Sequence, residues 1–382
     1  MSNPAQSALK GTGFSPYVTS AQGSGALAPE GSAKALRVAV LGVTGYSGAE
    51  LVRLLLDHPR LAAHPPLLLG RSGSETVALT SIHPQLSGLP NADSLSVVPF
   101  DWKLLANEKI DILFIATPHE QSREDVPAAI AAGLRIIDLS GAWRLHNDAN
   151  RTVYKLHDVD PALAAALQTE AVYGSPELHG EQIKTARLVA NPGCYATSII
   201  LALAPLIRAN VLDLNYGIIA DAKSGVSGAG KAPTPTTHFM YAADNLSAYA
   251  VFGHRHTGEL LEQLHLDASQ IQFTPHLLPI PRGILSTIYV RLAAPGSIIS
   301  IQSLYDEFYA NAPLVRVRRS PALPQIQHVV RTAFCDLGFQ LSPDGKRLVI
   351  ISCLDNLLKG AASQAVENMN LMAGFPQSEG LR

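Results

Sequence analysis

Apolar runs alternate with segments of helical spacing through the first third of the chain. Residues 36–42, 67–70, 111–116 and 134–138 are short apolar runs typical of buried strands. Residues 47–57 predict a helix with Leu51, Leu54 and Leu55 on one face, and residues 125–132 predict a second helix. Strands that alternate with helices imply a parallel sheet joined by right-handed crossovers.

The pattern changes after residue 190. A strong helix is predicted over residues 195–208, directly after an Asn-Pro-Gly turn at 191–193. Strand-like segments then dominate, with one further helix at 301–310 and a last helix at 356–373. The predicted strands are residues 215–222, 270–273, 283–292, 331–339 and 347–354. This half therefore indicates an α+β domain with a mostly antiparallel sheet.

Composition narrows the class of protein. The 382 residues are 47% hydrophobic and 16% charged, which is typical of a globular chain. The 29 basic and 31 acidic residues nearly cancel, so a nucleic-acid partner is not expected. No apolar run reaches the roughly 18 residues of a membrane span. Three cysteines without close pairs argue against a disulfide framework or a metal site, and they predict a cytoplasmic protein.

A glycine-rich loop at residues 42–48 (GVTGYSG) follows the first predicted strand and enters a helix. Glycines at this spacing let the backbone approach a pyrophosphate, and the helix N-terminus supplies N–H groups. A plain tight turn is the alternative, but the place between strand and helix favours a dinucleotide. The predicted cofactor contacts here are Gly42, Thr44, Gly45, Tyr46, Ser47 and Gly48.

The residues after the second predicted strand indicate which dinucleotide is bound. An NAD site would place Asp or Glu there, about 20 residues after the loop, to hold the ribose hydroxyls. This chain has Arg71 and Ser72 instead, which suit the 2′-phosphate of NADP, unless Arg71 is only a solvated surface charge. Thr117 and Pro118 follow the third strand, at the sheet edge that lines nucleotide crevices.

Cys194 lies where the Asn-Pro-Gly turn meets the predicted helix. A thiol at a helix N-terminus is expected to have a lowered pKa, and its thiolate is a good nucleophile toward an acyl carbon. Cys335 and Cys353 fall within predicted strands, and we interpret them as buried structural residues. Cys194 is therefore the candidate nucleophile.

Residues 253–259 (GHRHTGE) bring together two imidazoles, a guanidinium and a carboxylate. Such a group can supply the base that a covalent cysteine needs, together with substrate contacts. A zinc site is disfavoured because no second cluster of ligands is present. Either His254 or His256 alone would more often be structural.

Eight motifs, taken together, resemble one family, the N-acetyl-gamma-glutamyl-phosphate reductases, which are NADP-dependent enzymes of arginine biosynthesis. The resemblance runs in order over about residues 36–375. Its motifs are 42–51 (GVTGYSGAEL), 138–145 (DLSGAWRL), 173–178 (YGSPEL), 190–197 (ANPGCYAT), 223–231 (KSGVSGAGK), 253–260 (GHRHTGEL), 273–285 (FTPHLLPIPRGIL) and 355–365 (DNLLKGAASQA). Departures, such as Gly258 for a usual proline and Trp143 for a usual phenylalanine, remove no reacting group.

The resemblance implies a reductive dephosphorylation. Cys194 would displace phosphate from an acyl phosphate, NADPH would reduce the thioester, and His256 would act as acid/base. The implied substrate contacts are Arg144, Tyr249, His254 and Glu259, with Arg282 as a second anion-binding candidate; Arg144 has a structural ion pair as its alternative. The implied cofactor contacts in the second half are Ser224, Gly225, Gly228 and Asn356.

The resemblance also implies the domain organisation, a Rossmann-type NADP-binding domain plus an α+β catalytic and dimerisation domain, as in semialdehyde dehydrogenases. Residues 34–192 and 354–382 would form the first, and residues 193–353 the second. Residues 1–33, with Lys10 and Glu30 as their only charges, are predicted to be a disordered extension. The expected assembly is a homodimer or homotetramer.

Three other functions stay open at this point. A related reductase could act on an aminoadipyl phosphate or on aspartyl phosphate, although the paired histidines argue against the aspartyl enzyme. An inactive NADP-sensing protein of the same fold is a third possibility, which the joint presence of Cys194, His256 and Arg144 disfavours.

Overall fold

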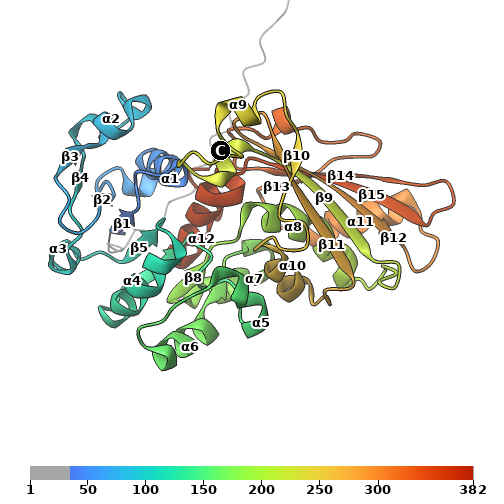
Figure 1. The fold of residues 1–382 in the computed structure, drawn as a ribbon, viewed down its shortest axis with the longest axis horizontal. Coiled ribbons are helices and arrows are strands. Elements are labelled where there is room, and N and C mark those ends of the chain that lie inside the picture. Colours follow the sequence, from blue (N-terminus) through green and yellow to red (C-terminus); the bar gives the residue numbers. More distant parts are fainter. Residues whose placement is uncertain (1–34, 382) are drawn as a thin grey trace, which may run out of the picture. The chain divides into compact units, whose positions relative to one another are not determined.

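The computed structural model describes residues 35–381, so the predicted extension at 1–33 lies outside the described residues. Residues 38–190 contain the strands of an eight-stranded sheet (Figure 1). Its spatial order is β3-β4-β2-β1-β5-β6-β8-β7, and all neighbours are parallel except β3 and β4. The strands are β1 (Val38–Leu41), β2 (Leu67–Leu69), β3 (Val77–Ala78), β4 (Ser96–Val98), β5 (Ile112–Ile115), β6 (Arg135–Asp138), β7 (Val172–Tyr173) and β8 (Leu188–Ala190). The strand order reverses between β1 and β5, and open α/β sheets bind ligands at such a point.

Helices cover both faces of this sheet because alternate strand residues point to opposite sides. Val38 and Val40 belong to a core shared with α1 (Tyr46–Leu56), α7 (Pro176–Thr185) and α12 (Ser363–Ala373). Ala39 and Leu41 belong to the core on the other face, under α4 (His119–Ala131) and α6 (Pro161–Glu170). The shorter helices of this half are α2 (Leu79–Ile82), α3 (Trp102–Asn107) and α5 (Asp148–Arg151).

The second sheet has seven strands in the order β10-β11-β9-β12-β15-β14-β13 and is mostly antiparallel. One face packs on α8 (Cys194–Arg208), α10 (Thr257–Leu264) and α11 (Ile298–Phe308) in a single apolar core. The opposite face carries half-exposed apolar side chains such as Ile219 and Tyr289. The strands are β9 (Ile218–Gly225), β10 (Ser247–Ala248), β11 (Ile271–Leu278), β12 (Ile284–Arg291), β13 (Val315–Val317), β14 (Cys335–Leu341) and β15 (Arg347–Leu354); the short helix α9 (Phe239–Ala242) lies between β9 and β10.

The predicted combination of a parallel and a mostly antiparallel sheet is confirmed, while several element bounds need correction. The strand predicted at 331–339 begins only at Cys335, because Arg331 has a left-handed φ of 65°. The strand predicted from residue 215 begins at Ile218, after a turn at Gly217 with φ 82°. The helix predicted at 125–132 already begins at His119. The last helix is preceded by a π-helical turn, η7 (Leu358–Ala362).

The segment after β15 leaves the second sheet. α12 contacts α1, α7 and β6, so the end of the described chain packs with the parallel sheet (Figure 1). This packing supports our proposal of a nucleotide-binding part made of two separate segments. The described residues from Leu36 onward nevertheless form one compact unit.

Candidate active site

A cavity of about 990 Å³ is lined by both halves of the fold. Loops after β1, β5, β6 and β8 contribute one wall, and the end of β9 with the loops before α10 contributes the other. It gathers most of the predicted site residues, namely Gly45, Tyr46, Ser47, Gly48, Thr117, Pro118, Arg144, Cys194, Ser224, Gly225, Gly228, Tyr249, His254, His256 and Asn356. The predicted site residues outside its lining are Gly42, Thr44, Arg71, Ser72, Glu259 and Arg282.

The glycine-rich loop has the shape that a dinucleotide needs. Gly42 has φ +95°, and a Cβ there would lie 2.5 Å from the carbonyl oxygen of Ala116. A Cβ on Gly48 would lie 2.4 Å from the oxygen of Gly42. α1 starts directly after Gly45 without a side-chain cap, so its first N–H groups are available to an anion. The loop therefore fits a pyrophosphate.

Thr117 gives a second sign of a ligand. It follows β5, across the switch point from β1, and its Oγ1 is buried without a hydrogen-bond partner among the described residues. Buried hydroxyls are normally paired, so an unpaired one in a cavity wall indicates a group that is bound there. This wall is adjacent to the glycine-rich loop, which agrees with a dinucleotide.

The opposite wall of the cofactor region is held by Asn356. Its Oδ1 accepts a hydrogen bond from the Gly283 N–H at 2.7 Å, and its Nδ2 donates to Ser227 Oγ at 2.9 Å. Gly225 is packed so closely that a Cβ would lie 2.7 Å from the nitrogen of Arg282. Asn356 thus fixes the 224–230 loop against the second sheet, at the place where both line the cavity.

Arg71 and Ser72 lie away from the cavity lining, just beyond the carboxyl end of β2. Both are exposed, and Arg71 forms no ion pair with any residue from 35 to 381. The Ser72 hydroxyl lies 3.5 Å from the carbonyl oxygen of Phe100. Because β1 and β2 are parallel neighbours, these residues lie at the same sheet edge as the glycine-rich loop. An unpaired guanidinium there remains free to meet a phosphate.

Cys194 is the first residue of α8, with Gly193 as its N-cap. The thiol lines the cavity, and burial raises its pKa to about 11. A hydrogen bond from the Tyr195 backbone and the charge of Arg144 act in the opposite direction but do not compensate. The expectation of a lowered pKa at this helix N-terminus is therefore wrong for the free protein, because burial disfavours the charged thiolate.

His254 and His256 both line the cavity, in a turn that leads into α10. Their rings meet edge to face with centroids 4.7 Å apart, and the Tyr195 ring contacts both. The turn therefore brings the two side chains together. His256 lies directly over the residue before the nucleophile, since a Cβ on Gly193 would be 2.4 Å from its Nε2. Tyr249 packs edge to face on His254.

Both imidazoles are neutral in the free protein. Burial, followed by the neighbouring His254, holds the pKa of His256 well below its usual range. Burial also lowers the pKa of His254 to about 4, with a contribution from Arg255. His256 Nδ1 has no hydrogen-bond partner among the described residues. A neutral ring with an unpaired nitrogen can accept or donate a proton.

Glu259 lies beneath the cavity rather than in its wall, and its side chain is fully buried. It accepts hydrogen bonds from the Gly193 N–H at 2.9 Å, from the Tyr173 hydroxyl at 2.7 Å and from Arg144 at 3.2 Å. Its Oε1 also lies 4.0 Å from Nε2 of His256, whereas Glu259 itself does not line the cavity. The predicted substrate contact is therefore corrected to a supporting role, in which Glu259 holds the turn that carries Cys194.

Arg144 lines the cavity, but its guanidinium is already engaged. Besides Glu259, it donates to the carbonyl oxygens of Asn191 at 2.7 Å and Leu139 at 2.8 Å. The structural ion pair that was the alternative for Arg144 is thus present. Three of its five N–H donors are used, so any contact with substrate is left to the remaining two.

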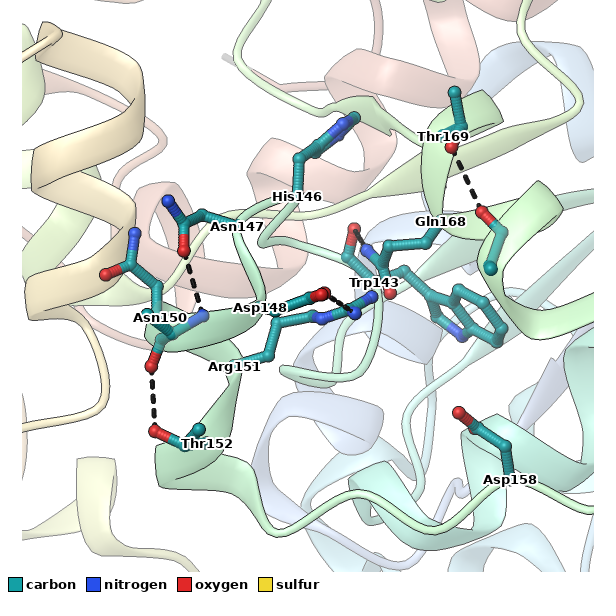
Figure 2. Close-up of polar contacts among 12 residues, drawn as sticks. Trp143, His146, Asn147, Asp148, Asn150, Arg151, Thr152, Asp158, Gln168 and Thr169 are labelled. Carbon is teal, nitrogen blue, oxygen red and sulfur yellow. Dashed lines mark hydrogen bonds and ion pairs between the residues drawn. The ribbon is translucent and has the colours of Figure 1, made fainter. Parts of the chain in front are cut away.

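Arg144 lies between Trp143 and Asn147 in the sequence, and this segment is anchored at both ends; Figure 2 shows Trp143, Gln168 and Asn147. Trp143 is fully buried, its indole N–H donates to Ser122 at 3.0 Å, and its carbonyl accepts from Gln168 at 2.9 Å. On the other side, the Asn147 side chain caps α5 with a hydrogen bond from the Ala149 N–H at 2.8 Å. The tryptophan at a position where the family usually has phenylalanine therefore has a partner for its polar atom.

Arg282 does not line the cavity, contrary to its predicted anion-binding role. Its guanidinium pairs with Glu50 of α1 at 2.6 Å and with Asp355 at 3.0 Å. Asp355 precedes Asn356, and Glu50 lies on the helix that follows the glycine-rich loop. Arg282 therefore joins the two walls of the cofactor region instead of binding an anion.

Sequence reasoning missed residues that the fold brings to the site. Arg255 and Lys231 line the cavity, and neither forms an ion pair with another described residue. Gly360 also lines it, so close to Cys194 that a Cβ would lie 2.6 Å from the Cys194 Cβ. Arg255 stands inside the 253–259 motif, so its charge was visible there, whereas nothing local marks Gly360 as a contact of residue 194.

The described residues contain neither a cluster of metal ligands nor a membrane-spanning helix. Between residues 35 and 381, no group of three or more His, Cys, Asp or Glu side chains is arranged to hold a metal ion. Within the same range, no helix has the length and apolar character that a bilayer crossing requires.

Comparison with known families first defines the class of protein. Residues 37–186 match the semialdehyde dehydrogenase NAD-binding domain, and residues 194–356 match the semialdehyde dehydrogenase dimerisation domain. The fold is similar to aspartate semialdehyde dehydrogenase II from Vibrio cholerae, with a TM-score of 0.65 and 19% identity over 90% of this chain and 99% of that one. A probable aspartate-semialdehyde dehydrogenase from Pseudomonas aeruginosa gives a TM-score of 0.62 and 21% identity over 88% and 98% of the two chains.

Closer relatives define the family. N-acetyl-gamma-glutamyl-phosphate reductases from Shouchella clausii and Geobacter metallireducens are 40% and 41% identical to this chain. Each alignment covers 91% of this chain and 98% of the relative. The chain belongs to the N-acetyl-gamma-glutamyl-phosphate reductase family.

Proposed function

We propose that the protein reduces N-acetyl-gamma-glutamyl phosphate to N-acetylglutamate 5-semialdehyde and phosphate with NADPH, as a step of arginine biosynthesis. The observation that carries this proposal is the meeting of two kinds of site in one cavity. A glycine-rich loop at a helix N-terminus suits a dinucleotide, and Cys194 and His256 line the same cavity. Membership of the family supports the choice of substrate.

The first step is attack of the Cys194 sulfur on the acyl carbon. The bond between this carbon and the phosphate oxygen breaks, phosphate leaves, and a thioester remains on Cys194. Because the free thiol has a raised pKa, its proton must be removed as the bond forms. We assign His256 as the base, because its ring lies over Gly193 and lines the same cavity. A phosphate dianion in the cavity raises the low pKa of this imidazole, which makes it a better acceptor when substrate is bound.

The anionic groups of the substrate need positive charge. Arg144 is committed to Glu259 and to two carbonyl oxygens, while Arg255 and Lys231 form no ion pair within residues 35–381 and line the same cavity. We assign the phosphate and carboxylate contacts chiefly to Arg255 and Lys231. Tyr249 and His254 complete this wall, and Arg144 contributes its two remaining N–H donors.

The residues that would hold the cofactor come from both halves of the fold. Tyr46, Ser47 and Gly48 offer backbone N–H groups to the pyrophosphate, and Thr117 offers its unpaired hydroxyl. When bound, NADPH supplies the hydride that reduces the thioester carbon. The resulting thiohemiacetal collapses to the aldehyde, and the proton held by His256 returns to the sulfur of Cys194.

Replacing Arg71 with alanine should raise the KM for NADPH roughly tenfold or more, because one charged hydrogen bond to the 2′-phosphate is lost. The KM for NADH should change little, since NADH has no phosphate at this position. Steady-state kinetics with both cofactors measures the effect. An equal loss with NADPH and NADH would assign Arg71 a structural role instead.

The proposed reaction is tested by following NADPH oxidation with three acyl phosphates in turn. N-acetyl-gamma-glutamyl phosphate should support turnover, while aspartyl and aminoadipyl phosphates should support little. Turnover restricted to one of the other two would reassign the substrate. Tight NADPH binding without oxidation of any substrate would favour an NADP-sensing protein.

The match to a dimerisation domain supports an oligomer, and we propose a homodimer or homotetramer. The face of the second sheet that carries the half-exposed side chains of Ile219 and Tyr289 is not part of the helical core, which suits a contact between copies. All three cysteines are free, and this agrees with our placement of the protein in the cytoplasm.

A further inference from the structure

Three charged side chains lie together in the interior, outside the cavity lining. Lys359 Nζ contacts Glu177 Oε1 at 2.7 Å and also pairs with Glu367 Oε2. At most 1% of each side chain is exposed. Lys359 belongs to the turn η7, Glu177 to α7 and Glu367 to α12, so the lysine joins three elements.

The turn that carries Lys359 packs directly on the nucleophile. Gly360, the next residue, allows no Cβ because Cys194 Cβ lies 2.6 Å from where that atom would be. The carbonyl oxygen of Ala361 accepts a hydrogen bond from the Asn191 side chain at 3.1 Å. η7 therefore touches both ends of the segment 191–194. π-Helical turns are rare and occur often at functional sites.

Burying the charges of these three residues costs free energy that a purely structural contact would not require. Burying one cation and two carboxylates requires removing three charges from water, and apolar side chains of similar volume often stabilise a fold as well or better. An ion pair, however, fixes directions that apolar contacts do not. The sequence around the lysine is otherwise apolar (LLKGAA, 357–362), so this single charge stands out.

We propose that Lys359 is a positioning residue for Cys194: by joining Glu177 to Glu367, it holds the π-helical turn against which the nucleophile rests. This inference rests on the proposed function of Cys194 and adds a residue that acts through the turn, without touching substrate.

The protonation of the carboxylates paired with Lys359 indicates that this ion-pair group changes its charge with pH. Burial raises the pKa of Glu367 to about 7, despite Lys359, whereas the lysine's charge leaves Glu177 with a lowered pKa. The other titratable groups that face the three are Tyr309 and Cys335, and burial keeps both neutral at pH 7. For Glu367 the folded pKa exceeds the unfolded one, so its contribution to stability is complete below about pH 4.5 and is lost as the pH rises through about 7.

The test compares full-length wild type with Lys359→Met. The variant should lower kcat about a hundredfold, since a displacement of about 1 Å at the reacting group costs this much. Its Kd for NADPH should stay within twofold. Loosening the turn admits water to Cys194, so the pH midpoint of its alkylation by iodoacetamide should fall by at least one unit. Folded Lys359→Met with unchanged kcat and midpoint would overturn the proposal.

Alkylation needs no substrate, so this readout separates the positioning role from the proposed reaction. Asp336→Asn is the matched control, because Asp336 is a fully buried carboxylate paired with Arg316 and Arg318 in the second sheet. It should lower the Tm while changing kcat less than twofold. A hundredfold loss of kcat in this control too would reduce the Lys359 effect to general destabilisation and overturn the proposal.

If Lys359→Met does not yield folded protein, Glu367→Gln tests the positioning role of Lys359 instead. The amide keeps a hydrogen bond to Lys359 but removes the titration near pH 7. The wild-type kcat should then show a step near pH 7 that the variant lacks. Identical pH profiles for the two proteins would overturn the proposal.

Discussion

Replacing Cys194 with serine should lower turnover by more than about 10³-fold while NADPH binding is retained. The hydroxyl is far less acidic than the thiol, so the reacting group loses its nucleophilicity. The glycine-rich loop lies on another element and keeps its geometry, because serine differs little from cysteine in size. NADPH oxidation measures the first effect, and a fluorescence titration with NADPH measures the second.

The other two cysteines provide controls for this substitution. Cys335 and Cys353 are fully buried in neighbouring strands of the second sheet, and Cys335 already lies 3.6 Å from the Ser352 hydroxyl. Cys335→Ser and Cys353→Ser should change the Tm but not the turnover of folded protein. A Cys194→Ser variant that kept more than a few per cent of the rate would contradict a covalent mechanism.

The position of the nucleophile could be predicted from the sequence, but its protonation state could not. A Pro-Gly turn before a helical pattern places Cys194 at a helix N-terminus, and α8 does begin there. The pKa depends on how much water reaches the sulfur. Among the residues that pack on the cysteine is Gly360, which is 166 positions further along the chain. Helix ends are local features, whereas burial is a tertiary one.

The same distinction explains which parts of the fold were predictable. Long segments with a clear period, such as α8 and β12, lie close to their predicted bounds. The two-residue strands β3, β7 and β10 were not predicted. Segments this short carry no period, and they become strands only because a neighbouring strand offers its edge.

The charged residues of the site show most clearly which features a sequence cannot predict. Glu259 and Arg282 stand in motifs that look like ligand contacts, and both are instead paired inside the protein. Arg144 reaches Glu259 across 115 positions, and Glu50 reaches Arg282 across 232. A sequence pattern shows that a charge is present but not which partner satisfies it, and a charge that is already paired has little left to offer a ligand.

Replacing His256 with asparagine should lower kcat by about 10²–10⁴-fold, the usual contribution of a general acid or base. Its ring lies over Gly193 beside the nucleophile, and its Nδ1 has no other partner among the described residues. Asparagine can hydrogen-bond but cannot carry the proton, so one limb of the pH–rate profile should disappear. The measurement is kcat and kcat/KM as a function of pH, with N-acetyl-gamma-glutamyl phosphate and NADPH.

His254 provides the matched comparison, because the two rings are in contact and both line the cavity. Its Nδ1 accepts a hydrogen bond from the backbone N–H of His256 at 3.1 Å, and an asparagine oxygen can accept the same bond. His254→Asn should therefore preserve the turn and act mainly on KM, provided that His254 binds the ground state and the transition state alike. The opposite pattern would exchange the roles of the two histidines. If both variants kept the wild-type pH profile, neither imidazole would move the proton, and the base would have to be sought elsewhere in the cavity.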